Sequence, residues 1–167
     1  AQLAAVYPNF YLLKDTSGED RIALAHGHLA GVFLVRGAEG QYSRWLNTGG
    51  GPYDGFLLSS ANCLSRELAA MMNQLATGNQ QEAGRLSSRI ERVVTGCFHV
   101  VRDYPVANPF TNANKILDHI MAYGGDARRH APPYLRGGHQ LPGEFVEQAY
   151  QIVMENDLAP RQGYLQA

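Results

Sequence analysis

Lys14 is the residue of this sequence best placed to act as a nucleophile. It ends the apolar run "FYLL" (10–14 with the lysine) and precedes the small polar stretch "DTSG". A lysine at the carboxyl end of a buried strand loses hydration, which lowers the pKa of its ammonium group and frees the amine to attack a carbonyl carbon. The same position also suits a lysine that packs its methylenes at a strand end and keeps its charge in water. Without further context the second interpretation is the commoner one.

The histidines and cysteines offer weaker chemical signals. His26 and His28 are separated by one residue, so on a helix they would face different directions, and the other histidines show no ligand spacing. We therefore expect no metal site. Cys63 and Cys97 lie far apart without a CxxC pair, which favours a reducing, cytoplasmic compartment. Cys63 at a helix start could be a stabilised thiolate, but a packed and inert thiol is the default expectation.

Short apolar runs alternate with helical patterns in the first part of the chain, which predicts parallel β-strands joined by helices. The predicted strands are 10–14, 31–36 and 53–60, with helices over 21–30 and 39–48 between them. Residues 17–20 resemble a capping box before the first helix. The second part is helical, with segments at 62–78, 81–101, 108–125 and 143–156. Asn62 and Asn108 are predicted N-caps, and Gly78 is a predicted helix stop.

Composition places the chain among ordinary globular proteins. It has 167 residues, 45% of them hydrophobic and 17% charged, with a formal net charge of −1. There is no basic excess for a nucleic acid and no apolar run long enough for a membrane span, so we expect neither partner.

Three motifs, in order, resemble the dihydrodipicolinate synthase / N-acetylneuraminate lyase family. "YPNFYLLKDTSGED" is similar to the segment around that family's Schiff-base lysine, "FLVRGAEG" to its strand-7 turn, and "GPYDGFLLSSAN" to its strand-8 pattern. The helical tail fits in order and spacing. The resemblance implies the C-terminal portion of a (β/α)8 TIM barrel, strands 6 to 8, within an α/β fold. Residues 1–62 would form the last three βα units, and residues 63–167 the final barrel helix and a C-terminal helical extension of the same domain.

The resemblance also implies an activity. Lys14 would be the catalytic lysine of a class I lyase or aldolase that acts on pyruvate plus an aldehyde, or on the corresponding 2-oxo acid, without a cofactor. The implied substrate-binding residues are Gly37, whose backbone approaches the carboxyl or carbonyl region, Glu39, which binds hydroxyls, Leu57, which lines the pyruvate site, and Ser59, which contacts the aldehyde-derived part. Gly37 could equally be a turn glycine, and Glu39 could stabilise a helix dipole.

Arg36 departs from the small or polar residue that the family carries there. Pointing inward, it could lower the pKa of Lys14 by repulsion or hold a second substrate carboxylate; pointing outward, it would be a surface arginine.

The match begins at the end of the family's fifth helix. The turn that binds the substrate carboxylate and the catalytic tyrosine have no counterpart in these residues. We therefore expect a homo-oligomer, a tetramer in most of the family, or a missing N-terminal half-barrel. The alternative hypothesis is a non-catalytic partial-barrel fragment that needs a partner chain or self-association.

Overall fold

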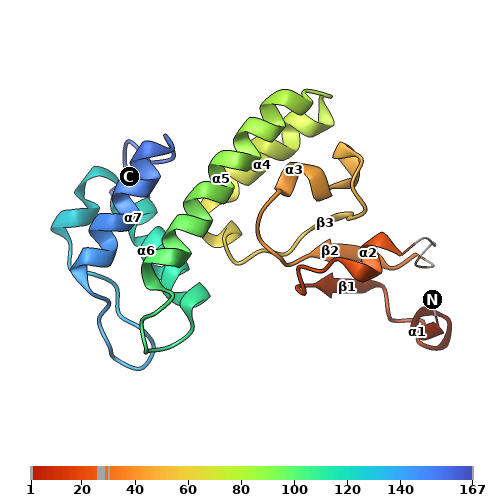
Figure 1. The fold of residues 1–167 in the computed structure, drawn as a ribbon, viewed down its shortest axis with the longest axis horizontal. Helices are drawn as coiled ribbons and strands as arrows, with labels where there is room; N and C mark the ends of the chain where they lie inside the picture. Colours follow the sequence, from red (N-terminus) through yellow and green to blue (C-terminus); the bar gives the residue numbers. More distant parts are fainter. Residues whose placement is uncertain (1, 26–28, 30, 167) are drawn as a thin grey trace.

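The computed structural model describes residues 2–25, 29 and 31–166, and it combines a small parallel sheet with a larger assembly of helices (Figure 1). The strands are β1 (Leu12–Asp15), β2 (Phe33–Arg36) and β3 (Gly55–Phe56). Short helices accompany them: α1 (Gln2–Val6), α2 (Arg21–Leu24), α3 (Tyr42–Trp45) and the 3-10 turn Asn47–Gly49. The long helices follow as α4 (Ala61–Ala76), α5 (Gln80–Val101), α6 (Pro109–Tyr123) and α7 (Gly143–Glu155), with a 3-10 segment at Gly124–Arg129.

The three strands are parallel and ordered β1-β2-β3. Lys14 pairs with Val35 and Asp15 with Arg36, while Arg36 also pairs with Phe56. Because all three strands run the same way, their carboxyl ends and the turns that follow lie at one edge of the sheet. That edge carries the residues singled out in the sequence.

The predicted TIM-barrel portion is wrong: the chain is mostly helical, and its only described sheet is small. A barrel wall needs long, tilted strands that close on one another, whereas these strands contain four, four and two residues. The helices between them, α2 and α3, have only four residues each and cannot form a barrel's outer ring. The strand–helix order was predicted correctly, but this order is compatible with an open sheet as well as with a closed one.

The main hydrophobic core belongs to the long helices. Fully buried residues include Leu64 and Met71 of α4, Ile90 of α5, Ile116 of α6 and Val153 of α7. A second, smaller cluster contains Leu34, Trp45 and Tyr53 and lies between the sheet and its short helices. Most apolar burial therefore stabilises the helical part, and the sheet is attached to it through α3 and the turn after β3.

Helix limits agree with the prediction where capping chemistry is strong. Asn108 accepts a hydrogen bond from the amide of Phe110 and Pro109 is the first residue of α6, as predicted. Gly78 follows α4 with a φ of 78°, also as predicted. Asn62 is not the cap of α4, because the helix already begins at Ala61 and the Asn62 amide donates to the Ser59 carbonyl. The predicted capping box is absent too: Asp20 precedes α2 without a side-chain cap.

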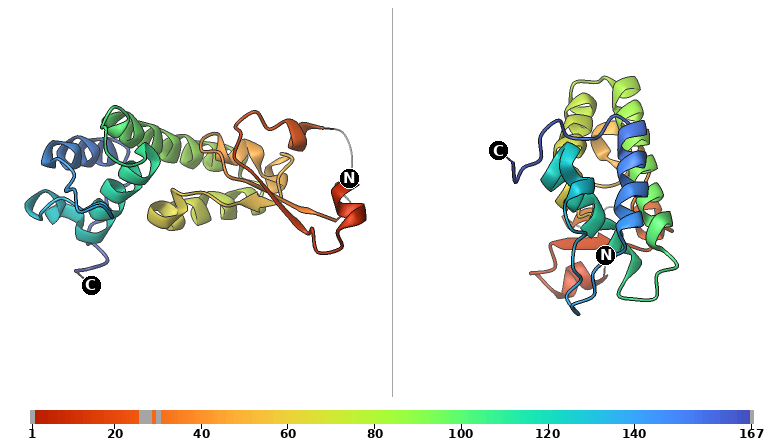
Figure 2. Two further views of the ribbon diagram at one scale, coloured as in Figure 1. Left: turned by 90° about the horizontal axis from the view of Figure 1, so that it is seen from below. Right: turned by 90° about the vertical axis from the view of Figure 1, so that its left-hand side faces the viewer.

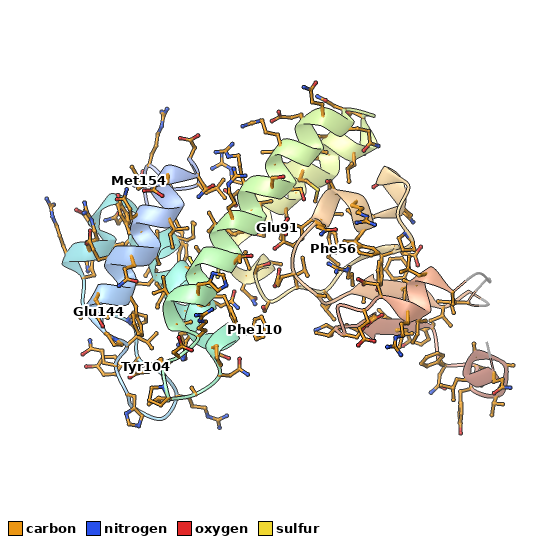
Figure 3. All side chains as sticks on the ribbon, in the orientation of Figure 1. Phe56, Glu91, Tyr104, Phe110, Glu144 and Met154 are labelled. Carbon is orange, nitrogen blue, oxygen red and sulfur yellow. The ribbon has the colours of Figure 1, made fainter. Side chains whose placement is uncertain are left out.

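The left view of Figure 2 shows the sheet at one end of an elongated molecule and the helices α6 and α7 at the other, with α4 and α5 between them. Glu91 of α5 links the two parts, since its carboxylate accepts a hydrogen bond from the amide of Gln41 just before α3 (Figure 3). In the described part of the chain, no helix has the length and apolar character needed to cross a membrane.

Candidate functional site

Lys14 lies against Gly37 at the carboxyl edge of the sheet. A Cβ atom built on Gly37 would fall on Cε of Lys14 and within 2.6 Å of the Thr16 hydroxyl oxygen. The Gly37 amide donates to the Asp15 carbonyl at 2.6 Å, which holds the turn after β2 against the end of β1. Two residues predicted for the site are therefore in contact, and any side chain at position 37 would displace the flexible end of Lys14.

Asp15, directly after the lysine, belongs to a buried polar cluster on the other face of the sheet. The Tyr53 hydroxyl lies 2.6 Å from Asp20 Oδ1 and 3.2 Å from Asp15 Oδ2. Arg36 forms a bidentate ion pair with Asp20, in which Nε donates to Oδ1 at 2.8 Å and Nη2 donates to Oδ2 at 3.0 Å. Tyr53 is fully buried, and Asp20 and Arg36 are nearly so. The cluster ties together β1, the start of α2, β2 and the segment before β3.

Both carboxylates of this cluster stay ionised more easily than free aspartate. The hydrogen bond from Arg36 holds the pKa of Asp20 below its usual value against the effect of burial, and Tyr53 adds to this. Burial alone would raise the pKa of Asp15, but hydrogen bonds from Ser17 and Tyr53 outweigh it and lower the pKa. Burial first, and then the hydrogen bond to Asp20, raises the pKa of the Tyr53 hydroxyl, so Tyr53 remains a donor.

Arg36 does not face Lys14. Its remaining donors bind the carbonyl oxygens of Ala38 at 2.8 Å and Gly40 at 2.9 Å, and its guanidinium stacks 4.5 Å from the centre of the Trp45 ring. Strand alternation explains this orientation: Arg36 pairs with Asp15, whose side chain points to the covered face, whereas Lys14 points to the open one. Arg36 therefore stabilises the turn after β2, and we no longer count it among the candidate substrate-binding residues.

Glu39 and Ser59 come together at the ends of β2 and β3. The Ser59 hydroxyl lies 3.2 Å from Glu39 Oε1, and the amide and hydroxyl of Ser60 donate to the same carboxylate at 3.1 and 2.7 Å. Tyr42 of α3 donates to it at 3.0 Å. Burial first, and then the charge of Glu39, raises the pKa of the Tyr42 hydroxyl, which keeps it protonated. Four donors thus fix the carboxylate two residues beyond Gly37.

The face of the sheet that carries Lys14 is open. Lys14 is exposed, and so are the neighbouring apolar side chains of Leu12, Phe33 and Leu57. The Leu57 amide donates to the Arg36 carbonyl at 3.0 Å, so this residue continues β3 beside β2. The structure therefore places Leu57 at the predicted edge, on a surface that is accessible in the single chain.

A cleft of about 380 Å³ lies beside Ser59, between the start of α4 and α6. Ser59 accepts a hydrogen bond from Asn114 Nδ2 at 3.1 Å, and the Cys63 thiol lies 3.3 Å from the Asn114 carbonyl. Burial, followed by the charges of Asp118 and Glu39, raises the pKa of the Cys63 thiol to about 12. Cys63 is thus a protonated wall residue, which agrees with the inert thiol expected by default. Asn114 was missed in the sequence because its role depends on how α6 packs.

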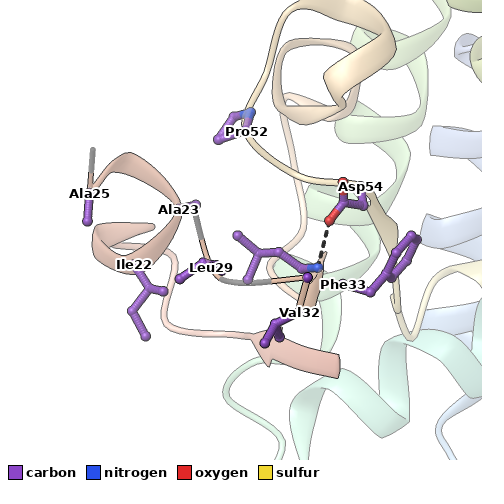
Figure 4. Close-up of a pocket in the computed structure, with 10 residues that line it drawn as sticks. Ile22, Ala23, Ala25, Leu29, Val32, Phe33, Pro52 and Asp54 are labelled. Atoms are coloured by element: carbon purple, nitrogen blue, oxygen red, sulfur yellow. Dashed lines mark hydrogen bonds between the residues drawn. The ribbon is translucent and has the colours of Figure 1, made fainter. Parts of the chain in front are cut away.

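A second cavity of about 380 Å³ lies at the other end of β2 (Figure 4). Most of the residues that line it have apolar side chains, but polar atoms contribute much of its surface. Asp54 accepts a hydrogen bond there from the amide of Leu34 at 2.8 Å. Parallel strands begin at this edge, whereas Lys14 lies near their carboxyl ends, so the cavity is separate from the candidate site.

No group of three or more histidine, cysteine or acidic side chains suited to a metal ion occurs among the described residues. His26 and His28, considered as a ligand pair in the sequence, lie outside the described residues.

The chain matches no protein-family model, no curated protein and no solved structure.

Proposed function

We propose that this protein is an imine-forming lyase or aldolase that acts on pyruvate and an aldehyde, or on the corresponding 2-oxo acid, with Lys14 as the nucleophile. The observation that carries the proposal is the contact between Lys14 and Gly37. Because Gly37 has no Cβ, the Lys14 side chain can lie directly against the turn after β2, at the carboxyl edge of the sheet. The resemblance of the motifs "YPNFYLLKDTSGED" and "GPYDGFLLSSAN" to the lyase family is the second support.

The chemistry follows from the amine. Uncharged Lys14 adds to the C2 carbonyl of pyruvate, and loss of water gives an iminium ion. The cation acidifies the C3 hydrogen, and loss of that proton gives an enamine. The enamine carbon forms a bond to the aldehyde carbonyl carbon, whose oxygen takes up a proton. Water then hydrolyses the product iminium and releases Lys14. The reverse sequence cleaves the corresponding 2-oxo acid.

Glu39 and Ser59 are proposed to bind the hydroxyl groups of the aldehyde part. The carboxylate is fixed by Tyr42 and Ser60, so a substrate hydroxyl needs to replace only the weak contact with Ser59, which is 3.2 Å long. Preorganised acceptors of this kind cost little reorganisation when a ligand binds.

An exposed amine is a poor nucleophile at neutral pH, because water stabilises its protonated form. We propose that self-association covers the open face around Leu12, Phe33 and Leu57 and thereby excludes water from the side chain of Lys14. The two free cysteines, Cys63 and Cys97, fit a reducing, cytoplasmic compartment.

The exposed face also supports a second candidate function, that of a non-catalytic chain which uses these apolar residues only to associate with a partner. The two candidate functions predict different results for one substitution. Lys14→Arg keeps the charge but removes the nucleophile, so it should abolish turnover of pyruvate with an aldehyde while association stays unchanged. Arg66→Lys, on the exposed side of α4, is the matched control and should retain full activity. If the unaltered protein shows no turnover under conditions in which it is associated, the non-catalytic function is supported and the lyase proposal fails.

A further inference from the structure

A pocket of about 400 Å³ lies at the helical end of the molecule, away from Lys14, between the start of α6 and a tight hairpin over residues 133–141. Lys115 of α6 and Arg136 and His139 of the hairpin line it, together with the apolar surfaces of Val106 and Tyr134. Lys115 and Thr111 also line the cleft beside Ser59, whereas the hairpin residues form the opposite wall of this pocket.

Backbone hydrogen bonds close the hairpin, which forms one wall of the pocket. Tyr134 and Gln140 form an antiparallel bridge, and the Leu135 amide donates to the His139 carbonyl at 2.8 Å. Leu135 and Leu141 are buried in the main core and anchor both arms. The tip between these anchors therefore holds Arg136 and His139 at the pocket without a large loss of backbone freedom when a ligand binds.

The opposite wall is fixed as well. Asn112 is fully buried in α6 and donates from Nδ2 to the Val106 carbonyl at 2.8 Å. The next residue, Ala107, has a φ of 61°, a left-handed conformation that is uncommon for residues other than glycine. The first turn of α6 begins directly afterwards, and its Thr111 also lines the pocket.

The charged side chains that line the pocket, Lys115 and Arg136, are both positive. None of its lining residues is acidic. Among the described residues, the acidic side chains that form ion pairs do so with other arginines, and no ion pair includes Lys115, Arg136 or His139. Lys115, Arg136 and the His139 ring can therefore all donate to one ligand. A compact group with several acceptor oxygens, such as a phosphate, satisfies such a set.

We propose that this pocket binds a small phosphate monoester with an apolar body. Lys115 and Arg136 hold the phosphate with help from His139 and Thr111, while Val106 and Tyr134 pack against the organic part. This site goes beyond the proposed lyase activity and does not depend on it.

Phenyl phosphate is the probe for this proposal, added to the full chain while amide chemical shifts are followed by NMR. Saturable shifts are expected at Lys115, Arg136 and His139. Because both charge and apolar contact contribute, we expect phenyl phosphate to bind more tightly than inorganic phosphate or benzoate, and more weakly as salt is added. Absence of saturation, or benzoate binding as tightly as phenyl phosphate, would overturn the assignment.

Two variants test the residues. Lys115→Gln and Arg136→Gln should each weaken phenyl phosphate binding about tenfold or more, because each removes a charge-assisted hydrogen bond. Arg66→Gln removes an exposed charge from α4 and should leave the affinity unchanged. The side chains of Lys115 and Arg136 are both exposed, so their substitution should not disturb the core. Unfolding temperatures that are unchanged in the absence of ligand will show that the two variants fold. Equal affinity in all three variants contradicts the proposal.

Discussion

The side chain of Lys14 lies against Gly37, and a Cβ at position 37 would clash with Cε of the lysine. The lysine side chain thus lies beside the turn after β2, at the edge of the sheet where Glu39 and Ser59 also meet. The proposed chemistry depends on this contact.

Gly37→Ala should therefore displace Lys14 and Thr16 while the fold remains intact. A displacement of about 1 Å can slow a reaction about 100-fold, so we expect a loss of that order in the rate at which pyruvate is captured. Gly84→Ala on α5 is the control, since a Cβ there meets nothing within 4 Å and alanine favours helix. Equal rates for the two variants would show that the contact does not position the lysine.

Asp20→Asn should strongly destabilise the protein, because it leaves the buried guanidinium of Arg36 without its counter-charge. The two side chains are 3% and 6% exposed, so the pair is shielded from solvent. Breaking such a pair costs about 3 kcal/mol of the free energy of unfolding, as measured with urea. Glu82→Gln, which breaks the exposed pair with Arg85, should change stability little. Similar effects of the two substitutions would rule out a structural role for the buried cluster.

Acid should destabilise the protein through the same cluster. The pKa values of Asp15 and Asp20 are lowered by folding, so both carboxylates contribute stability that is fully present above their unfolded pKa, about 3.9. This contribution is lost as the pH falls through the lower, folded pKa values. Urea unfolding should show a free energy of unfolding that declines below about pH 4, with a smaller decline in Asp20→Asn. An unchanged acid dependence in that variant would contradict this origin.

Both cysteines should react slowly with alkylating reagents in the native protein. Burial raises the pKa of Cys63 and of Cys97 to about 12, which leaves very little thiolate at neutral pH. At pH 8 we expect iodoacetamide to modify each at least about 100-fold more slowly than a free thiol of pKa about 8.5. The unfolded protein in urea is the control and should react at the free-thiol rate. Rapid modification of native Cys63 would restore the reactive-thiol hypothesis.

The long helices could be predicted from sequence because their signals are local. Residues such as Asn108 and Gly78 mark helix ends by hydrogen bonding and backbone conformation within a few residues. The extent of the sheet could not be predicted in the same way. A strand becomes part of a barrel only through distant partners, and the same apolar run "FYLLK" suits an open sheet.

In the candidate site, too, some features could be predicted from the sequence and others depend on distant partners. Parallel strands bring the segments after β2 and β3 to one edge, and the Glu39–Ser59 contact follows from that. The orientation of Arg36 could not be decided at a strand end without knowing its partner. That partner, Asp20, was assigned to a helix cap, and the third member, Tyr53, carried no signal beyond its apolar neighbours.

Reductive trapping tests the central claim most directly. The protein is incubated with pyruvate and sodium borohydride, digested, and mapped by mass spectrometry. The chain contains two lysines, Lys14 and Lys115, so the second serves as an internal control. We predict a stable adduct on Lys14 with the added mass of pyruvic acid less one oxygen atom, no comparable adduct on Lys115, and none on the new lysine of Arg66→Lys. An unmodified Lys14 in the associated protein, or equal labelling of all exposed lysines, would contradict the assignment of Lys14 as an imine-forming nucleophile.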